Sequence, residues 1–561
     1  MTQAETLKIL KMGKNVFLTG AAGSGKTYVL NKYINFLKKY GVGVAVTAST
    51  GIAATHLKGM TIHSWSGIGI KDTLTEYDLD AMEQRAYLWK RFEKTSVLVI
   101  DEISMLSAST LNCVDQVCKL FKRSDLPFGG IQVIFSGDFF QLPPIEKKND
   151  FQQPTIFLDE EESGTPFAFK AKSWKEANLQ VCYLSGQFRQ KDNIITNLLS
   201  EIRGGNFSDK SVAVLNKRII TKDDENITKL HTHNRNVDAF NNRKIKAIKS
   251  KEKEYKMTHK GNANLVEALK RGCLVPENLI LKKGALVMFV KNNPTVGYVN
   301  GTVGKIVGFE STHPVVRCND GNEYLAEPQV WSVEEGGKIL AEISQVPLKL
   351  AWAVTIHKSQ GMTLDKAVID LSGSFVEGQG YVALSRVKTI EGLFLRGFNK
   401  MAVTVHGEIL KIDKELKNNS NKLFIKMKNL KATDFKSKHK KFFKEVGAKK
   451  IKVLDDTGRK LSTYQITHNL IKKRDSINQI VTSRSLKIGT ILTHIEKLLE
   501  DGSLNKSDII YLKPKTPEFS DLIESVKEEI KNTEEFKLTT IFKALGGHYS
   551  FDEIRFAKIF C

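Results

Sequence analysis

The sequence lacks several features that would place it in a specialised class of protein. No apolar run approaches the ~20 residues that a bilayer-spanning helix needs, and the opening stretch, MTQAETLKILKMGKN, has no apolar signal-peptide core. The six cysteines are scattered without a CxxC pair, which argues against disulfide-dense and zinc-ribbon folds. No long-period internal repeat and no long low-complexity tail are visible. We therefore expect a cytoplasmic protein of bacterial type that makes no membrane contact.

The sequence has fewer acidic residues than basic ones. Lys and Arg number 85 against 62 Asp and Glu, which gives a net charge of +23. A polyanionic partner is the physical expectation, because each Lys or Arg docked on a phosphate releases condensed counterions. The alternative is a basic surface with no dedicated partner. Charge does not distinguish DNA from RNA.

Short apolar strands alternate with helical segments in the first 170 residues. Strand patterns occur at 15–19, 43–50, 97–102 and 132–138, and the last three end in polar residues. Such alternation predicts a parallel sheet covered on both faces. Ligands of such sheets bind at the carboxyl ends of the strands. The fold class is therefore predicted to be α/β.

The rest of the 561-residue chain is expected to form further domains. A second α/β series is predicted over 171–407, interrupted at about 284–346 by short strands and Asn-Gly, Asp-Gly and Gly-Gly turns that are typical of a small antiparallel β-barrel. Residues 408–460 are rich in lysine and are interpreted as a solvated linker. Because aromatic residues lie among these lysines, nucleic-acid contact is the alternative. A helical domain is predicted over 461–561.

The strongest motif is the segment GAAGSGKT, placed between a strand and a helix. It comprises Gly20, Ala21, Ala22, Gly23, Ser24, Gly25, Lys26 and Thr27. Glycines let the backbone N–H groups wrap phosphates, and the start of the next helix adds a favourable dipole. Lys26 is expected to neutralise the β- and γ-phosphates of ATP, and Thr27 to coordinate Mg²⁺.

Acidic and polar side chains at later strand ends complete the predicted hydrolytic site. Asp101 is the expected second Mg²⁺ ligand, and Glu102 is placed to deprotonate the attacking water. Gln141 follows another strand and is a candidate γ-phosphate sensor, with a plain loop glutamine as the alternative. Arg189 and Arg386, both expected in the second domain, would offset transition-state charge, unless they only form surface salt bridges.

The ordered motifs resemble those of superfamily-one DNA helicases, specifically the Pif-one (petite integration frequency) family, close to RecD-like motors. The residues that carry the resemblance span about 3–400. They are GAAGSGKT, VTASTGIAATHL, TIHSWSGIG, VIDEISML, PFGGIQVIFSGDFFQLPPI, QFRQ, VNGTVGKIVGF, AVTIHKSQGMTLDKAVIDL and GQGYVALSRV. The resemblance implies two RecA-like motor domains, the inserted barrel and a wedge insertion at about 65–93. Trp65, Tyr77, Tyr87 and Trp89 offer apolar surface in that insertion.

The resemblance also adds site residues. Gln3 would read adenine, Gly361 would join the nucleotide set, and Gln141, Arg189 and Arg386 would act as argued from their chemistry. The implied single-strand contacts are Thr47, Ser49, Thr61, His63, Asn300, Thr355, His357, Lys358 and Ser359. Without the resemblance, His63 and His357 would be interpreted as packed histidines. Hydroxyls and backbone amides at strand ends suit a motor, because they hold phosphates without reading bases.

The C-terminal segment 461–512 contains apolar positions that fit two short helices and a turn. It resembles the helix-turn-helix module of RecQ-type helicases. Its second helix, about 488–500, carries candidate DNA-facing side chains. They are Thr490, Thr493, His494 and Lys497. A protein-docking or structural helical module is the alternative.

The predicted function is an ATP- and Mg²⁺-dependent, monomeric, nucleoid-associated helicase that acts on single-stranded and forked DNA in genome maintenance. Movement from 5′ to 3′ is implied only by the resemblance. A DNA-bound regulator with a switching ATPase and an RNA-directed motor are the rival hypotheses.

Overall fold

A computed structural model gives the fold. It describes residues 1–69, 71–144, 167–190, 192–222, 224–232, 237–293, 296–310, 312–335, 338–449, 461–484, 486–514, 516–531 and 538–561. The chain divides into two compact units. The first comprises Met1–Asn293 and Tyr298–Lys450, and the second comprises Ile451–Cys561 with the short segment Pro294–Gly297.

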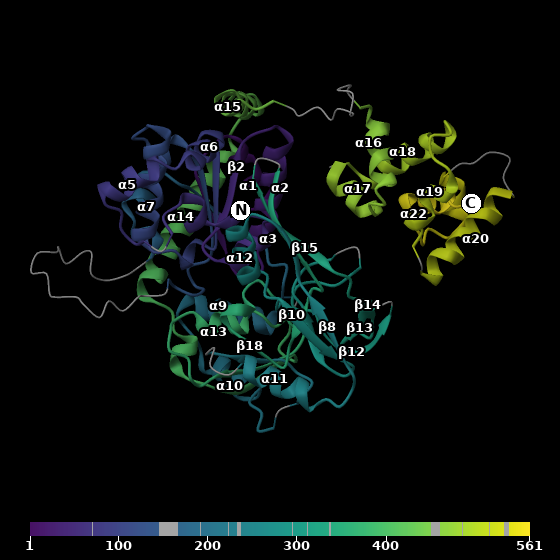
Figure 1. The fold of residues 1–561 in the computed structure, drawn as a ribbon, viewed down its shortest axis with the longest axis horizontal. Helices are drawn as coiled ribbons and strands as arrows, with labels where there is room; N and C mark the ends of the chain where they lie inside the picture. Colours follow the sequence, from purple (N-terminus) through teal and green to yellow (C-terminus); the bar gives the residue numbers. More distant parts are fainter. Residues whose placement is uncertain are drawn as a thin grey trace, which may run out of the picture. The chain divides into compact units, whose positions relative to one another are not determined.

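The first α/β domain, drawn in purple and blue in Figure 1, is built on a parallel sheet. The order of its strands is β3-β2-β4-β5-β1-β6. Its strands are β1 (Val16–Gly20), β2 (Val44–Ala48), β3 (Met60–Thr61), β4 (Val97–Asp101), β5 (Gln132–Ser136) and β6 (Gln180–Leu184). β1, β4 and β5 are buried at every position, as continuous apolar runs predict. Because β6 pairs with β1, the first domain extends past the predicted boundary at residue 170.

Helices cover both faces of this sheet. Val16 and Leu18 of β1 belong to the core beneath α1 (Gln3–Lys11) and α2 (Lys26–Lys39), whereas Phe17 belongs to the opposite core. This alternation follows from the two-residue period of a strand. The other helices of the domain are α3 (Gly51–His56), α4 (Ile62–Ser66), α5 (Glu76–Glu83), α6 (Ala86–Lys94), α7 (Ala108–Lys122) and α8 (Lys172–Glu176).

A second parallel sheet, in the order β18-β7-β19-β20, confirms the second α/β domain. Its strands are β7 (Lys229–His231), β18 (Ala353–Thr355), β19 (Ala367–Leu371) and β20 (Leu393–Phe398). Its helices are α9 (Asn193–Gly204), α10 (Asp209–Asn216), α11 (Val237–Ala247) and α13 (Gln379–Leu384).

The strands inserted in the second domain form antiparallel sheets, but a closed barrel is not confirmed. They divide among sheets of five, three and two strands, in the orders β14-β13-β12-β11-β17, β15-β16-β9 and β10-β8. The strands are β8 (Glu252–Lys256), β9 (Thr258–Gly261), β10 (Asn278–Lys282), β11 (Leu286–Phe289), β12 (Val303–Glu310), β13 (His313–Cys318), β14 (Glu323–Leu325), β15 (Gln329–Glu335), β16 (Lys338–Gln345) and β17 (Leu348–Leu350). With α12 (Ala263–Gly272), these elements begin before the predicted position 284. The β15–β16 hairpin contacts the first domain, where Glu334 pairs with Lys38 and Lys58 at 2.9 and 3.3 Å.

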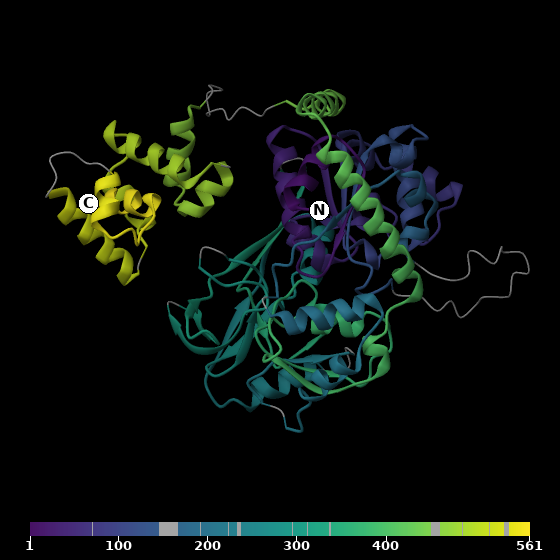
Figure 2. The same ribbon diagram turned by 180° about the vertical axis from the view of Figure 1, so that it is seen from behind.

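The interpretation of 408–460 as a solvated linker is wrong for residues 408–449, and 450–460 lie outside the described residues. This stretch forms α14 (Gly407–Lys428) and α15 (Ala432–Glu445), and α14 runs along the first domain beside β6 (Figure 2). Leu423 and Phe442 are buried in the core beneath α1 and α2. An apolar stripe among the many lysines of this stretch, which the linker interpretation overlooked, anchors both helices. The lysines of α15 remain exposed.

The wedge segment 65–93 presents some of its predicted aromatic side chains and buries others. Trp65 is buried, and Trp89 packs edge-on against a phenylalanine of α7. Tyr77 and Tyr87 are 80% and 53% exposed. No helix among the described residues is long and apolar enough to cross a bilayer.

The second unit is helical, as the sequence predicts. Its helices are α16 (Thr463–Lys472), α17 (Ile477–Arg484), α18 (Ile488–Glu500), α19 (Lys506–Ile509), α20 (Pro517–Lys531), α21 (Leu538–Ala544) and α22 (Phe551–Lys558). Thr490, Thr493 and Lys497 are exposed on α18. The prediction that His494 faces DNA is wrong, because this residue is buried and its Nδ1 lies 2.9 Å from the Oγ1 of Thr467.

Candidate nucleotide and DNA sites

The phosphate loop connects β1 to α2, as predicted. Gly20, Gly23 and Gly25 have φ angles of 147°, 88° and 86°, in the region that favours glycine. A Cβ atom on Gly23 would lie 2.5 Å from the Cβ of Arg189. The loop therefore requires glycine both for its backbone angles and for the close approach of a neighbouring segment.

Lys26 lies within this loop. Its Nζ donates hydrogen bonds to the carbonyl oxygens of Gly20 at 2.9 Å and Ala21 at 3.3 Å. Burial lowers the pKa of Lys26, and the negative charges of Asp138 and Glu102 oppose that change. The ammonium group is thus placed among phosphate-loop carbonyls and two carboxylates, where a phosphate would offset its desolvation.

Asp101 and Glu102 stand at the carboxyl end of β4. The N–H of Glu102 donates to the Oδ1 of Asp101 at 3.0 Å. Glu102 has a φ of 51°, a strained conformation for a residue other than glycine and one that is common at functional sites. Burial, and then repulsion from Asp101, raises the pKa of Glu102 to about 7, and burial also raises the pKa of Asp101.

Among the residues that the structure describes, two buried oxygen atoms of this site find no hydrogen-bond partner. They are the Oγ of Ser24, in the phosphate loop, and the Oε2 of Glu102. Buried polar atoms are normally paired, so these two fit a polar ligand and its ordered waters. Thr27 lies in the first turn of α2, where the helix dipole favours an anion. The residues present therefore fit Mg²⁺ and a nucleoside triphosphate.

Arg189 and Arg386 approach the site from beyond the first sheet. Arg189 lies in the connection from β6 to α9, rather than in the second domain itself, and Arg386 follows α13. Burial, and then repulsion from Arg189, lowers the pKa of Arg386 to about 9, whereas Glu102 opposes this change. Arg386 is 1% exposed, and its Nε donates to the carbonyl oxygen of Val382 at 2.9 Å. Both guanidinium groups therefore act electrostatically on the predicted catalytic carboxylate.

Two further side chains flank the phosphate loop. The Nε2 of Gln3 lies 2.2 Å from the position that a Cβ on Gly25 would occupy, which places the predicted adenine-reading residue at the loop. Phe188 is 66% exposed, and its N–H donates to the carbonyl oxygen of Gly23 at 3.0 Å. The sequence reasoning missed Phe188, although it lies within the quoted QFRQ motif, because nothing in sequence predicts its exposure.

Gln141 and Gly361 have different surroundings. Gln141 is buried just after β5, where its N–H donates to the carbonyl oxygen of Asp138 at 2.9 Å. A Cβ on Gly361 would meet only the ring of His56 within 4 Å. The structure thus places Gly361 near α3, and among the described residues no phosphate-loop atom lies within 4 Å of that Cβ position.

The predicted DNA contacts of the first domain divide into two kinds. Thr47 is fully buried, and its hydroxyl donates to the carbonyl oxygen of Val99 at 2.6 Å. Its side chain therefore stabilises the sheet and is not exposed to a DNA strand. Ser49 is partly exposed and donates to the carbonyl oxygen of Glu102 at 2.8 Å. Thr61 caps α4, which carries the half-buried His63.

The corresponding residues of the second domain divide similarly. Thr355 and Ser359 are buried and bond to nearby backbone groups, so their hydroxyls fix the turn rather than present themselves to DNA. His357 and Lys358 are half-buried in the same turn, η4 (His357–Ser359). Asn300 is buried, and neither polar atom of its side chain has a hydrogen-bond partner within the described part of the chain, which fits a polar ligand.

Two lysines near these residues were not anticipated from the sequence. Burial, and then repulsion from Lys358, lowers the pKa of Lys349 to about 7. Burial, and then repulsion from Lys58, lowers the pKa of Lys291 to about 8. Clustered lysines that repel one another would be stabilised by a polyanion. A single lysine in a strand pattern gives no such signal, because the cluster depends on tertiary contacts.

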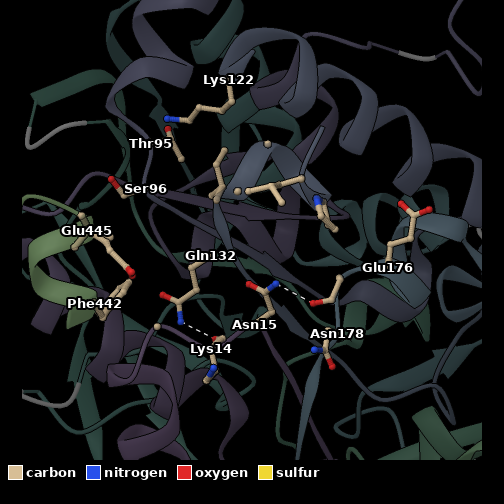
Figure 3. Close-up of a pocket in the computed structure, with 18 of the residues that line it drawn as sticks. Lys14, Asn15, Thr95, Ser96, Lys122, Gln132, Glu176, Asn178, Phe442 and Glu445 are labelled. Carbon is tan, nitrogen blue, oxygen red and sulfur yellow. Dashed lines mark hydrogen bonds between the residues drawn. The ribbon is translucent and has the colours of Figure 1, made fainter. Parts of the chain in front are cut away.

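A cavity of about 550 Å³ lies at the opposite edge of the first sheet (Figure 3). Asn15, Gln132 and Gln180 line it at the amino ends of β1, β5 and β6. The Nδ2 of Asn15 donates to the carbonyl oxygen of Ala177 at 2.8 Å, and the Nε2 of Gln132 donates to that of Lys14 at 2.7 Å. These amides tie backbone segments together, so the cavity belongs to the scaffold.

Comparisons with known proteins agree with this arrangement. A profile described as PIF1-like helicase matches residues 3–224, one described as DNA helicase Pif1, 2B domain, matches residues 264–309, and one described as helix-turn-helix domain matches residues 463–558. The ATP-dependent DNA helicase Pif1 of Psychrobacter sp. is 39% identical, and the match covers 90% of this chain and 88% of that protein.

Solved structures are similar as well. Pif1 from Bacteroides sp in complex with ADP-AlF4 is 32% identical and has a TM-score of 0.64, over 75% of this chain and 97% of that chain. Pif1 from Bacteroides in complex with ADP-AlF3 and ssDNA is also 32% identical, with a TM-score of 0.51 and the same coverage. An identity of 39% over nearly the full length of a relative, on this pair of α/β domains, shows that the chain belongs to the PIF1-like helicase family.

Proposed function

We propose that the chain is an ATP- and Mg²⁺-dependent DNA helicase that moves 5′ to 3′ on single-stranded DNA and unwinds duplex DNA. The observation that carries this proposal is the site shared by the two α/β domains. Its phosphate loop and Glu102 come from the first domain, and Arg386 comes from the second. A site divided in this way couples hydrolysis to domain movement. The direction of travel follows from the family resemblance.

The hydrolytic chemistry is assigned to residues at the junction. Glu102 accepts a proton from the attacking water while the new bond to the γ-phosphorus forms and the bond to ADP breaks. Lys26, Arg189 and Arg386 offset the negative charge of the transferring group. Thr27 and Asp101 would hold Mg²⁺, which would supply positive charge against the nucleotide phosphates. Gln3 and Phe188 are assigned to the adenine base.

The DNA path is assigned to the polar groups that the structure leaves accessible or unpartnered. The partly accessible groups are Ser49, Thr61 and His63 in the first domain and His357 and Lys358 in the second. Asn300 is the buried one, and its side-chain amide has no hydrogen-bond partner among the residues that the structure describes. The hydroxyl of Ser49 is hydrogen-bonded to the backbone of Glu102, the proposed general base. Movement of the bound DNA strand would therefore alter the geometry of Glu102. The helix-turn-helix unit is proposed to contact duplex DNA or a protein partner through the exposed face of α18.

The test is a substrate panel with purified full-length chain. ATPase stimulation and strand separation are measured on forked DNA, on RNA, and on duplexes with a 5′ or a 3′ single-stranded tail. The proposal expects stimulation by single-stranded DNA and unwinding only of forked and 5′-tailed duplexes. Unwinding of the 3′-tailed duplex alone would overturn the polarity, stronger stimulation by RNA would favour the RNA motor, and ATPase indifferent to DNA would favour the regulator.

A further inference from the structure

A buried polar network crosses from the phosphate loop to the second α/β domain. The N–H of Ala22 donates to the hydroxyl of Tyr381, on α13, at 3.1 Å. That hydroxyl donates to the Oδ2 of Asp138, after β5, at 3.3 Å. Arg203, at the end of α9, donates to both carboxylate oxygens of Asp138 at 2.7 and 2.8 Å and to Tyr381 at 3.1 Å. Four chain segments that are distant in sequence therefore meet at one hydroxyl and one carboxylate.

The network is charged and almost completely withdrawn from water. Asp138 is 0% and Tyr381 is 1% exposed, and the side chain of Arg203 is 10% exposed. Burial would raise the pKa of Asp138, but Arg203 and Lys26 outweigh it, so the pKa lies below its usual value. A buried ion pair of this kind is costly to leave with one partner missing. It therefore holds its members in one relative geometry.

The network also contacts the turn that carries the predicted γ-phosphate sensor. The Oδ1 of Asp138 accepts the N–H of Phe140 at 3.3 Å, and its carbonyl oxygen accepts the N–H of Gln141 at 2.9 Å. The guanidinium of Arg203 lies 4.0 Å from the ring centroid of Phe140. A displacement of the Gln141 turn must therefore be transmitted to Asp138 and, through it, to Arg203 and Tyr381.

On the second-domain side, the network fixes the helix that positions an arginine. Tyr381 lies on α13, and Arg386 follows the same helix, with its Nε bonded to the carbonyl oxygen of Val382. Arg203 extends the network away from the nucleotide. It donates to the hydroxyl of Tyr183 at 2.6 Å, and Tyr183 donates to Asp413 of α14 at 2.9 Å.

We propose that Tyr381, Asp138 and Arg203 form an interdomain relay, which holds α13 against the phosphate loop so that the nucleotide state sets the position of Arg386. These are positioning residues, since they act through Gln141, the phosphate loop and Arg386. The proposal rests on the proposed ATPase function and adds the connection between its two halves. It assigns a role to three residues that the phosphate-loop chemistry does not use.

Tyr381→Phe tests the relay, because it removes one hydroxyl and keeps the ring. Tyr33→Phe is the matched control. Tyr33 is equally buried, and its hydroxyl bonds to the carbonyl oxygen of Leu10 and to Gln132, both at 2.9 Å and both within the first domain. Steady-state ATPase is measured with saturating single-stranded DNA. The affinity for single-stranded DNA is measured with and without a non-hydrolysable ATP analogue, and thermal unfolding is recorded for every variant.

The relay predicts a fall in kcat of roughly 10- to 100-fold for Tyr381→Phe, because a misplacement of about 1 Å can cost on the order of 100-fold. The KM for ATP should change much less, and the effect of the ATP analogue on DNA affinity should shrink toward none. Tyr33→Phe should lower thermal stability by a comparable amount. It should leave kcat, and the effect of the ATP analogue on DNA affinity, at the wild-type value. Combining Tyr381→Phe with Arg203→Lys should add little to the larger single effect, because both variants break one network.

Equal kcat values for Tyr381→Phe and Tyr33→Phe would overturn the relay, and so would a variant whose only change is a raised KM. Should Tyr381→Phe unfold, Asp138→Asn is measured in its place, and wild-type coupling in that variant would also overturn the relay. The wild-type protein separates the two proposals. A wild-type ATPase that DNA does not stimulate refutes the proposed function, whereas a stimulated wild type with unaltered variants refutes the relay alone.

Discussion

Replacing Gly23 by alanine should lower the rate of ATP hydrolysis through a steric contact with Arg189. This effect can be distinguished from that of backbone strain by a control variant. Gly23 has a φ of 88°, and a Cβ there would lie 2.5 Å from the Cβ of Arg189. Non-bonded carbon atoms are about 3.5–4.0 Å apart at contact, so Arg189 or the loop must move by roughly 1 Å. A misplacement of that size can lower a rate on the order of 100-fold. The left-handed backbone adds a folding cost of about 1–2 kcal/mol.

Gly321→Ala provides the matched control for this variant. Gly321 has a φ of 84°, and no atom of the described residues lies within 4 Å of the position its Cβ would take. Both variants should lose the stability that the left-handed backbone costs, and Gly23→Ala should also lose the stability that the close contact costs. Only Gly23→Ala should lose DNA-stimulated ATPase. If Gly23→Ala hydrolyses ATP at the rate of Gly321→Ala, the contact between the phosphate loop and Arg189 has no catalytic importance, and the reasoning is refuted.

Three further predictions concern the base, the wedge and the basic helix. Glu102→Gln should lower kcat by roughly 100- to 10,000-fold, since it removes a general base, while DNA and nucleotide binding persist in titrations; a wild-type rate would exclude Glu102 as the base. Tyr77→Ala should slow unwinding of forked DNA and leave ssDNA-stimulated ATPase unchanged, and equal unwinding would exclude this exposed ring as the wedge. Replacing three exposed lysines of α15 by glutamine should weaken the salt dependence of duplex binding. The slope of log binding constant against log salt concentration should fall in magnitude by about 2 to 3, at ~0.9 per phosphate contact. An unchanged slope would mean that α15 touches no DNA. The three lysines are Lys436, Lys440 and Lys444.

The features that sequence predicts well are local. The segment GAAGSGKT locates a strand–loop–helix unit to within a few residues. The run VLVID predicts both a buried strand and the polar residue at its end. The two α/β domains and the helical C-terminal unit were predictable for the same reason, because apolar periodicity is written along each element. Chemistry carried by a short loop or a strand end is thus recoverable without a structure.

The errors arise where burial depends on distant partners. Thr47 and His494 belong to polar residue types that suit nucleic-acid contact, yet each is buried and hydrogen-bonded to a group that only the fold brings near. The lysine-rich helix α15 shows the converse case. Its charges suggest a solvated segment, whereas Phe442 anchors it in the core of the first domain.

The interdomain network shows the same limit at the catalytic junction. Arg203 lies 65 residues from Asp138 and 178 from Tyr381, so no spacing rule connects them. Arg203 looks like the last-turn cation of an ordinary helix, a position that the helix dipole favours by itself. Only the tertiary structure shows that its guanidinium is withdrawn from water and shared between two domains.

The central claim is that ATP hydrolysis at the phosphate loop drives strand separation. Its most direct test is the unwinding of a forked DNA duplex by the wild-type chain and by Lys26→Ala under identical conditions, with single-stranded DNA binding measured in parallel. We predict ATP-dependent unwinding by the wild type, and none by Lys26→Ala, which should still bind the strand. Unwinding by Lys26→Ala at the wild-type rate would contradict the account.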